Sequence, residues 1–301
     1  MKIPFAALAL ACAPLTAMAQ DVTVDAFGGP VTVAQSPETV VALDLAAIDT
    51  LHALGVPLDG VPNLTPPAFL ASAFDGVPNV GTLFEPDFEA LAVLGPDLIV
   101  AGGRSQPVVG ALSELAPTLD MTIDGLDLVA EAKARTTAYG AIFDKTAEAE
   151  ALNAALDAKI AQTQEAVSGK GSALILMANG GKLSAYGADS RFGWLHSVTG
   201  LPQAYADISV ESHGQAVSFE FIAEVNPEWI LVIDRLAAIG RAGEAAAATL
   251  DTPLLAQTTA GQRGQILYLD SAPLYLAAGG ATALPHILDQ LIDGFQATNG
   301  S

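Results

Sequence analysis

The feature that most constrains the fold of this chain is an internal repeat. The segment FEALAVLGPDLIVAGGR (88–104) aligns without a gap on FEFIAEVNPEWILVIDR (219–235), 131 positions later. Each copy starts with Phe-Glu, passes through a Pro followed by an acidic residue, and ends in an apolar run closed by Arg. This order is typical of a short helix followed by a buried strand. The repeat therefore predicts two lobes of like construction, the alternative being a chance match between two ordinary helix–strand units.

Helix and strand patterns alternate on both sides of each copy. VTVDAFGGPVTVA (22–34) predicts a β-hairpin around Gly28-Gly29. Further strands are predicted in TVVALD, TLDMTID, SALILMA, KLSAYG and QILYLD. Further helices are predicted in LAAIDTLHALG, PVVGALSELA, RFGWLHSVTG, the Ala-rich stretch after the second copy, and ALPHILDQLIDGFQA. Strands alternating with helices indicate parallel βαβ units, so the predicted fold class is α/β.

A long uninterrupted helix is predicted between the two halves. TAEAEALNAALDAKIAQTQEAVSG has no Pro, no Gly before its last residue, and many strong helix formers. A helix of about 22 residues is roughly 33 Å long. A chain of 301 residues is long enough for two domains. We therefore predict an N-terminal lobe over 20–144, a linking helix over 145–168 and a C-terminal lobe over 169–301.

The first residues predict export. MKIPFAALALACAPLTAMAQD has one Lys, a short apolar stretch and an A-x-A site ending at Ala19, which is typical of a cleavable secretory signal over 1–19. The sole cysteine, Cys12, lies inside this segment, and ALAC leaves lipoprotein processing open as an alternative. After cleavage the chain has no cysteine and therefore no disulfide. We expect a periplasmic protein.

The charge of the chain makes its few cations informative. A formal net charge of -21 argues against nucleic acid and anionic lipid as partners. Only 12 residues are Lys or Arg, yet Arg104 and Arg235 both follow an apolar strand of the repeat. Ligands of open α/β sheets bind beyond the carboxyl ends of the strands, so both side chains can line one cleft and hold an anion with paired oxygens. The alternative is a solvated arginine paired with a nearby carboxylate such as Asp234.

Two glutamates, one histidine and one tyrosine are further candidates for a functional role. Glu89 and Glu220 fall in the first turn of the repeated helix, where a carboxylate favours the helix dipole. They are also a matched pair of surface charges, one on each lobe. His213, in a predicted loop beside a glycine, is a candidate metal ligand. Tyr275, in a predicted loop after the strand QILYLD, either packs beneath that loop or binds iron as phenolate. The remaining histidines are expected to be packing or surface residues: His52, His196 and His286.

The sequence lacks the common catalytic and nucleotide-binding motifs. It has no G-x-G-x-x-G after a strand, no Walker A motif, no G-x-S-x-G, no H-E-x-x-H and no cysteine pair for zinc. These absences weigh against an enzyme.

Several segments resemble those of a known family. SRFGWLHSVTG, HGQAVSFEFIAEVNPEWILVIDR and YLDSAPLYLAAGG are similar to periplasmic ferric-siderophore-binding proteins of the catecholate type and helical-backbone class. LIVAGGRS extends the resemblance to the first half. It implies two Rossmann-like lobes joined by one long α-helix, with the iron complex in the cleft between them. It also implies a monomeric, non-catalytic binding protein without an intrinsic cofactor, which delivers an Fe(III)–siderophore to an inner-membrane ABC permease for iron uptake.

The resemblance also implies roles for individual residues. Three arginines would balance the three negative charges of a ferric tris-catecholate, and they match Arg104, Arg191 and Arg235. A histidine and a tyrosine would bind the iron when the siderophore leaves two coordination sites empty, and they match His213 and Tyr275. Two glutamates would dock on the permease, and they match Glu89 and Glu220. Pro273-Leu274 stands where relatives often have an aromatic or charged residue, which leaves the siderophore open.

Three other functions stay open at this stage. A receptor for haem or a corrinoid would need broad apolar surfaces, which three arginines suit less well. An exported α/β enzyme would need a nucleophile or cofactor motif that the sequence does not contain. A structural or adhesive exported protein is the third, and tight one-to-one binding of a chelate would exclude it as the main role.

Overall fold

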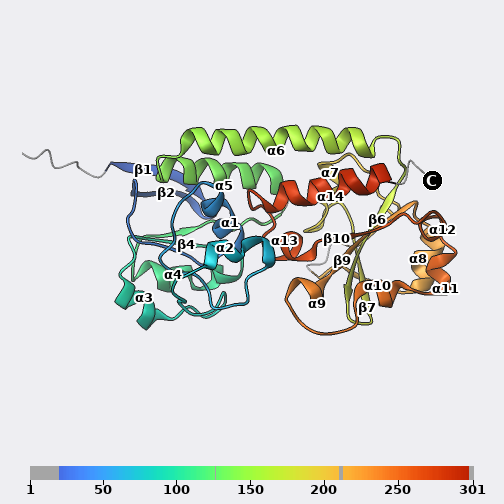
Figure 1. Ribbon diagram of the computed structural model, residues 1–301, viewed down its shortest axis with the longest axis horizontal. Coiled ribbons are helices and arrows are strands. Elements are labelled where there is room, and N and C mark those ends of the chain that lie inside the picture. The colour runs from blue at the N-terminus through green and yellow to red at the C-terminus, as the bar shows by residue number, and fades with distance from the viewer. Residues whose placement is uncertain (1–19, 126, 210–212, 298–301) are drawn as a thin grey trace, which may run out of the picture.

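The computed structural model describes residues 20–125, 127–209 and 213–297 (Figure 1). The predicted signal over 1–19 and Cys12 lie outside these residues. In the part of the chain that is described, no helix is both long enough and apolar enough to cross a membrane.

The first lobe combines a hairpin with a small parallel sheet. Strands β1 (Asp21–Ala26) and β2 (Gly29–Ala34) pair antiparallel, with Phe27 and Gly28 as the turn, one position earlier than predicted. The sheet has the order β3-β4-β5, all parallel, from β3 (Val40–Ala42), β4 (Leu98–Ala101) and β5 (Thr118–Asp120). Its helices are α1 (Leu45–Ala53), η1 (Ala68–Leu70), α2 (Ala71–Phe74), α3 (Phe88–Leu94), η2 (Gly103–Val108) and α4 (Val109–Ser113).

The second lobe contains a larger, mixed sheet. Its order is β10-β9-β6-β7-β8, from β6 (Ala173–Asn179), β7 (Lys182–Tyr186), β8 (Gln215–Val217), β9 (Trp229–Asp234) and β10 (Ile266–Leu269). Strands β10, β9 and β6 are parallel, whereas β7 and β8 add antiparallel at one edge. Its helices are α7 (Trp194–Ser197), α8 (Phe219–Val225), α9 (Arg235–Ala238), α10 (Ala246–Leu250), α11 (Pro253–Ala256), α12 (Thr259–Arg263), α13 (Ser271–Leu276) and α14 (Ala283–Ala297).

The sequence repeat corresponds to a structural repeat. The three parallel strands β3-β4-β5 of one lobe match β6-β9-β10 of the other, with α3 and α8 in the same place. The acidic residue after the repeated Pro accepts an equivalent backbone hydrogen bond in both copies. Asp97 accepts a hydrogen bond from the backbone N–H of Thr39 at 2.9 Å, and Glu228 accepts one from that of Ser172 at 2.8 Å. Each carboxylate thus holds the start of the neighbouring strand. The lobes differ in β7 and β8, which the first lobe lacks in its described residues.

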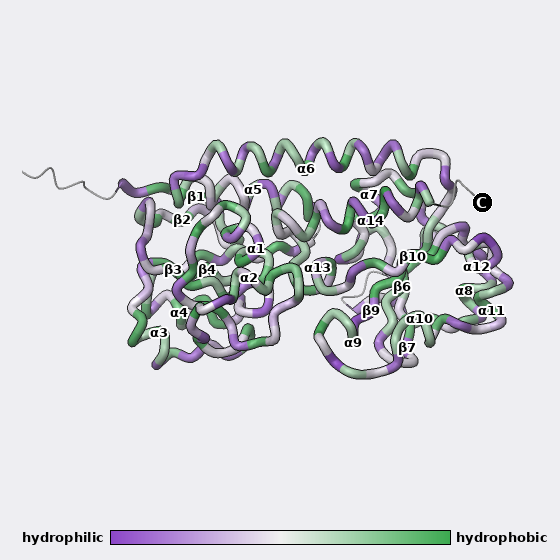
Figure 2. The backbone as a smooth tube through the Cα atoms, viewed as in Figure 1, coloured by the Kyte–Doolittle hydropathy of each residue, from purple (hydrophilic) through white to green (hydrophobic). Residues whose placement is uncertain are grey.

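One long helix joins the lobes. Helix α6 (Thr146–Val167) runs along both lobes, above α5 (Leu128–Ile142) at one end and α14 at the other (Figure 1). Its hydrophilic and hydrophobic residues alternate along the tube, as expected of a helix with one face on the protein (Figure 2). Helix α5 is an element that the sequence analysis missed. It contains Thr136, Thr137 and Gly140, which lower its helix propensity, and packing against β1 and α6 supplies the stabilisation that propensity does not.

A buried aspartate links the two lobes by hydrogen bonds. Asp49, in α1, is only 1% exposed. It accepts hydrogen bonds from the backbone N–H groups of Thr282 and Ala283 at 2.8 and 2.9 Å, and from the Thr282 hydroxyl. It therefore caps the start of α14 from the opposite lobe.

Candidate ligand-binding site

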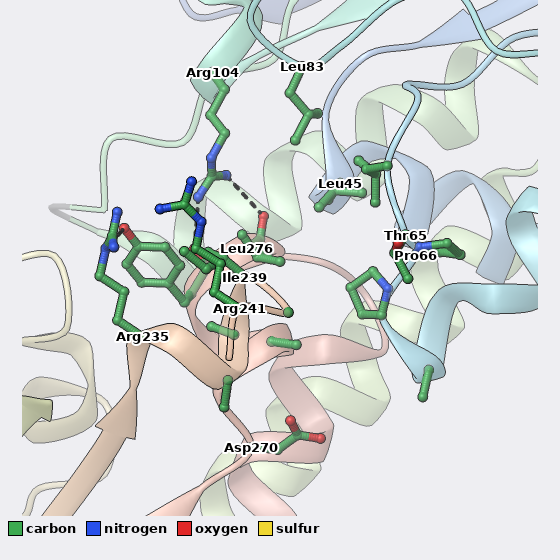
Figure 3. Close-up of a pocket in the computed structure, with 18 of the residues that line it drawn as sticks. Leu45, Thr65, Pro66, Leu83, Arg104, Arg235, Ile239, Arg241, Asp270 and Leu276 are labelled. Atoms are coloured by element: carbon green, nitrogen blue, oxygen red, sulfur yellow. Dashed lines mark hydrogen bonds between the residues drawn. The ribbon is translucent and has the colours of Figure 1, made fainter. Parts of the chain in front are cut away.

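Two adjoining cavities share the side chains of Arg235 and Tyr275, and the larger of the two lies between the lobes. The larger has a volume of about 750 Å³ and is lined from the first lobe by Leu45, Leu64, Leu83 and Arg104, among others (Figure 3). The second lobe contributes Arg235, Arg241 and Tyr275. The smaller cavity, of about 300 Å³, shares Arg235 and Tyr275 with the larger and adds Lys182, Arg191 and His213. The residues that line the smaller cavity all belong to the second lobe, and Tyr275 is part of the wall of both cavities.

Tyr275 lies in a helix and not in the predicted loop. It is the fifth residue of α13, which starts directly after the N-cap position Asp270. Pro273 occupies the first turn of this helix, where the missing N–H would have no intrahelical partner. The helix therefore forms despite the proline, and it presents the phenol to the cleft.

The three predicted arginines surround Tyr275. The guanidinium carbons of Arg104, Arg191 and Arg235 lie 5.7, 4.7 and 5.8 Å from the centroid of its ring. Arg235 Nε donates a hydrogen bond to the Tyr275 hydroxyl at 3.2 Å. Arg104 and Arg191 donate to the Tyr275 backbone carbonyl at 3.4 and 3.3 Å. The structure thus brings together residues that are up to 171 positions apart in the chain.

The repeated strands position two of these arginines. Arg104 lies in η2, which follows β4, and Arg235 is the first residue of α9, which follows β9. The carboxylate of Asp234 does not pair with Arg235, because it accepts hydrogen bonds from the backbone N–H groups of Ala237 and Ala246 at 3.0 and 2.8 Å. Arg235 instead contacts Tyr275 and the side-chain oxygen of Asn179, at 3.4 Å. The alternative of an Arg235–Asp234 pair was wrong.

The cluster of like charges alters the titration of its members. Burial alone would raise the pKa of the Tyr275 phenol, but the hydrogen bond from Arg235 and the three guanidinium charges outweigh burial and lower it below 10.0. The pKa of Arg104 is lowered mainly by burial, while the nearby carboxylate of Asp44 opposes that change. A phenolate therefore forms at Tyr275 more readily than at a free tyrosine.

His213 lines the smaller cavity together with Tyr275. It is exposed, and its backbone carbonyl accepts a hydrogen bond from the Tyr186 hydroxyl at 2.8 Å. Burial raises the pKa of Tyr186 to about 12, so this hydroxyl stays a donor. The other histidines line neither cavity and make local contacts instead: His52 with Ser72, His196 with the Leu201 carbonyl, and His286 with Asp270.

The two predicted glutamates are exposed and lie outside both cavities. Glu89 is in the first turn of α3 and Glu220 in the first turn of α8, one on each lobe. The pKa of Glu220 is lowered by a hydrogen bond from its own backbone N–H and by one involving the Ser218 side chain. Each glutamate thus has the favourable position at a helix start that the sequence predicted.

Two cations of the cleft were missed by the sequence analysis. Arg241 lines the larger cavity and Lys182 the smaller. With the three predicted arginines, five of the 12 Lys and Arg residues line these cavities, although the chain has 33 carboxylates. Asp270 is the one carboxylate among the described residues that line them. The cleft therefore reverses the charge balance of the whole molecule, which favours an anionic ligand.

Comparison with curated proteins finds relatives over most of the chain. The petrobactin-binding protein YclQ of Bacillus subtilis is 34% identical over 270 residues, covering 88% of this chain and 84% of that protein. The ferric-anguibactin-binding protein FatB of Vibrio anguillarum is 31% identical over 280 residues, covering 89% of this chain and 86% of that protein.

Comparison with solved structures also finds similar proteins over most of the chain. The crystal structure of YclQ superimposes with a TM-score of 0.87 at 32% identity, covering 92% of this chain and 99% of that one. The periplasmic catecholate-siderophore-binding protein VctP of Vibrio cholerae gives a TM-score of 0.84 at 30% identity, covering 92% and 100%. The family model described as "Periplasmic binding protein" matches residues 40–273. On these matches, which span both lobes and the linking helix, the chain belongs to the periplasmic binding protein family.

Proposed function

We propose that this protein binds an Fe(III)–siderophore of the catecholate type in the cleft and delivers it to an inner-membrane ABC permease. The observation that carries the proposal is the set of three guanidinium groups around Tyr275 in a chain with a net charge of -21. Such a cluster repels itself unless an anion neutralises it. The petrobactin-, anguibactin- and catecholate-siderophore-binding relatives support the same function.

In this proposal the arginines bind the ligand and not the iron. Arg104, Arg191 and Arg235 donate hydrogen bonds to the catecholate oxygens, for which planar guanidinium groups are suited. A siderophore with four donor atoms leaves two sites on the iron, and His213 and Tyr275 fill them. Both residues line the smaller cavity, and the lowered pKa of Tyr275 favours the phenolate that iron(III) prefers.

The rest of the proposed transport role concerns the outer surface and the ends of the chain. Glu89 and Glu220 would each meet a basic residue of the permease, which fits their exposure on separate lobes. We propose a monomer exported to the periplasm by a signal cleaved after Ala19, with lipid attachment at Cys12 as the alternative. The lobes would be 20–144 and 169–301, with the helix over 145–168 between them. The role requires no catalysis.

Titration of the mature protein with ferric catecholates tests this function. Ferric complexes with four and six donor atoms are added, and tryptophan fluorescence and the visible iron band are followed. We expect tight one-to-one binding of both and a colour change only for the four-donor complex. His213→Ala and Tyr275→Phe should remove that change. Binding that lacks the colour change in the wild type would leave the arginines as the site and discard the two iron ligands.

The matched control is Arg263→Gln, because Arg263 ends α12 and lines neither cavity. It changes the net charge as Arg235→Gln does. Arg235→Gln should weaken binding by about tenfold or more, as expected for a lost charged hydrogen bond, while Arg263→Gln should not. Failure of the wild type to bind any ferric catecholate would refute the proposed function.

A further inference from the structure

We propose that Arg241 and an apolar rim of the opposite lobe form a second subsite in the larger cavity. This subsite would bind a carboxylate carried by the organic scaffold of the ligand, apart from the groups that hold the iron. The rim consists of Leu64, Leu83 and Phe84. The inference rests on the proposed function and concerns a part of the ligand other than its iron-binding groups.

Arg241 is a cation without a partner in a cavity. It is exposed and lines the larger cavity, where Figure 3 labels it with Arg104 and Arg235. The other three arginines each contact Tyr275, but no residue in the described part of the chain forms an ion pair or hydrogen bond with the Arg241 guanidinium. Asp270 lines the same cavity and contacts His286 at 3.2 Å instead. The guanidinium of Arg241 is thus available for an anion from solution.

The loop that carries Arg241 is held at both ends. It connects α9 to α10, and the carboxylate of Asp234 accepts a hydrogen bond from the first turn of each helix, at Ala237 and Ala246. The Arg241 N–H donates to the Leu236 carbonyl at 2.9 Å. Gly240, directly before Arg241, has a φ of 64°, a conformation that favours glycine. Asp234 therefore acts as a positioning residue for Arg241.

Arg241 lies outside the repeat. It follows Arg235, the last residue of the second copy, by six positions, so this cation is an addition to the shared construction and not a consequence of it. The larger cavity is for this reason asymmetric, with a cation from one lobe facing apolar side chains from the other.

The apolar rim leaves carbon surface open at the cavity. Phe84 is 63% exposed at the edge of the cavity, in a turn where the Thr82 hydroxyl accepts hydrogen bonds from the N–H groups of Phe84 and Glu85 at 3.3 and 3.0 Å. Leu64 and Leu83 lie partly buried in the same wall. A ligand that spans the cavity would cover this apolar surface with its carbon skeleton while its carboxylate binds Arg241. The subsite thus favours an amphipathic scaffold that carries one free acid group.

Two synthetic ferric chelates test the subsite by calorimetric titration. Both have the same two catechol groups, and their linkers differ only in carrying a carboxylate or a methyl group. We expect the wild type to bind the carboxylate chelate about tenfold more tightly or better. Arg241→Gln should abolish this preference, because it should weaken the carboxylate chelate about tenfold more than it weakens the methyl chelate. Arg263→Gln should keep the preference, because it removes the same charge outside the cleft.

Each outcome separates the subsite from the proposed function. Equal affinity of the wild type for both chelates would refute the subsite and leave the proposed function intact. Equal weakening of both chelates by Arg241→Gln would also refute it, because Arg241 would then act on the chelate as a whole. Retained binding of the methyl chelate shows that the variant is folded. Failure of both chelates to bind the wild type would instead refute the proposed function and, with it, the subsite.

Discussion

At the scale of single residues, the site depends on one tyrosine and the charges around it. Tyr275 is half-buried, and it accepts a hydrogen bond from Arg235 while two further guanidinium groups lie near its ring. Burial disfavours the phenolate, whereas the three cations favour it, and the cations prevail. The phenol of Tyr275 therefore ionises more readily than a free tyrosine, which is what the proposed iron ligation requires.

The pKa of Tyr275 gives a pH-dependent prediction. Near-ultraviolet absorbance during a pH titration should show one phenol that ionises below 10.0, and Tyr275→Phe should remove it. Arg235→Gln should shift that ionisation upward, because it removes the hydrogen bond and one charge. If Tyr275 binds iron as phenolate, the four-donor complex releases a proton when it binds below this pKa. Its affinity should then fall about tenfold per unit decrease in pH, unlike that of the six-donor complex.

If the phenol ionisation below 10.0 persists in Tyr275→Phe, its assignment to Tyr275 is wrong. The titrations of Tyr139, Tyr186 and Tyr268 provide internal references, because burial raises the pKa of all three.

At the scale of elements, the repeated helix–strand unit needs a left-handed backbone conformation at the end of its helix. A different residue type provides it in each lobe. Helices α3 and α8 both end in a left-handed residue before Pro, which is Gly95 in one lobe and Asn226 in the other. Asn226 also accepts a hydrogen bond from the N–H of Thr259 at 2.7 Å through its side chain. The second lobe therefore uses the same turn both to end a helix and to hold the start of α12.

Alanine substitutions at Gly95 and Asn226 should lower the free energy of unfolding by different amounts. Gly95→Ala should lower the free energy of unfolding by about 1 kcal/mol, since a Cβ there meets no atom within 4 Å and only the backbone conformation opposes it. Asn226→Ala should cost about 2 kcal/mol, because it combines that backbone term with a lost hydrogen bond. Asn226→Gly should recover the backbone part. Urea unfolding of the three variants measures the difference, and equal costs for Asn226→Ala and Asn226→Gly would contradict it.

At the scale of the whole molecule, the two lobes are joined in more than one place. Helix α6 packs on α5 at one end and on α14 at the other, and Asp49 caps α14 from the first lobe. A continuous helix resists bending, and a buried carboxylate with three donors resists separation of α1 from α14. Both features oppose the large hinge closure seen in binding proteins with flexible links.

We therefore predict small lobe movement on binding. The radius of gyration from solution scattering should change little when a ferric catecholate is added to the wild type. Asp49→Ala should lower stability by about 2 kcal/mol or more, because it removes the cap and leaves buried donors unpaired. It should also increase the compaction measured on binding. A large compaction in the wild type would show that neither α6 nor Asp49 restrains the lobes.

The sequence by itself determined the two-lobed α/β plan, because the repeat, the long Gly-free helix and the buried strands are local patterns of polarity and propensity. It did not determine helix α5, whose threonines and glycine make it a weak helix until β1 and α6 pack against it. It also placed Tyr275 in a loop, since Pro273 is read as a breaker until its position in a first turn is known.

The residues of the site could be predicted only in part, because most of their contacts join distant parts of the chain. Arg104 and Arg235 follow from the repeat, because the end of a parallel strand can be located from the sequence. His213 and Tyr275 were candidates from their residue types and predicted loops, and the family resemblance paired them. Arg191 could be proposed only through that resemblance, and Arg241 has neither a repeat nor a motif to identify it. Which of the scattered cations meet around one phenol was decided by the tertiary structure, because contacts between residues far apart in the chain depend on how the two lobes pack.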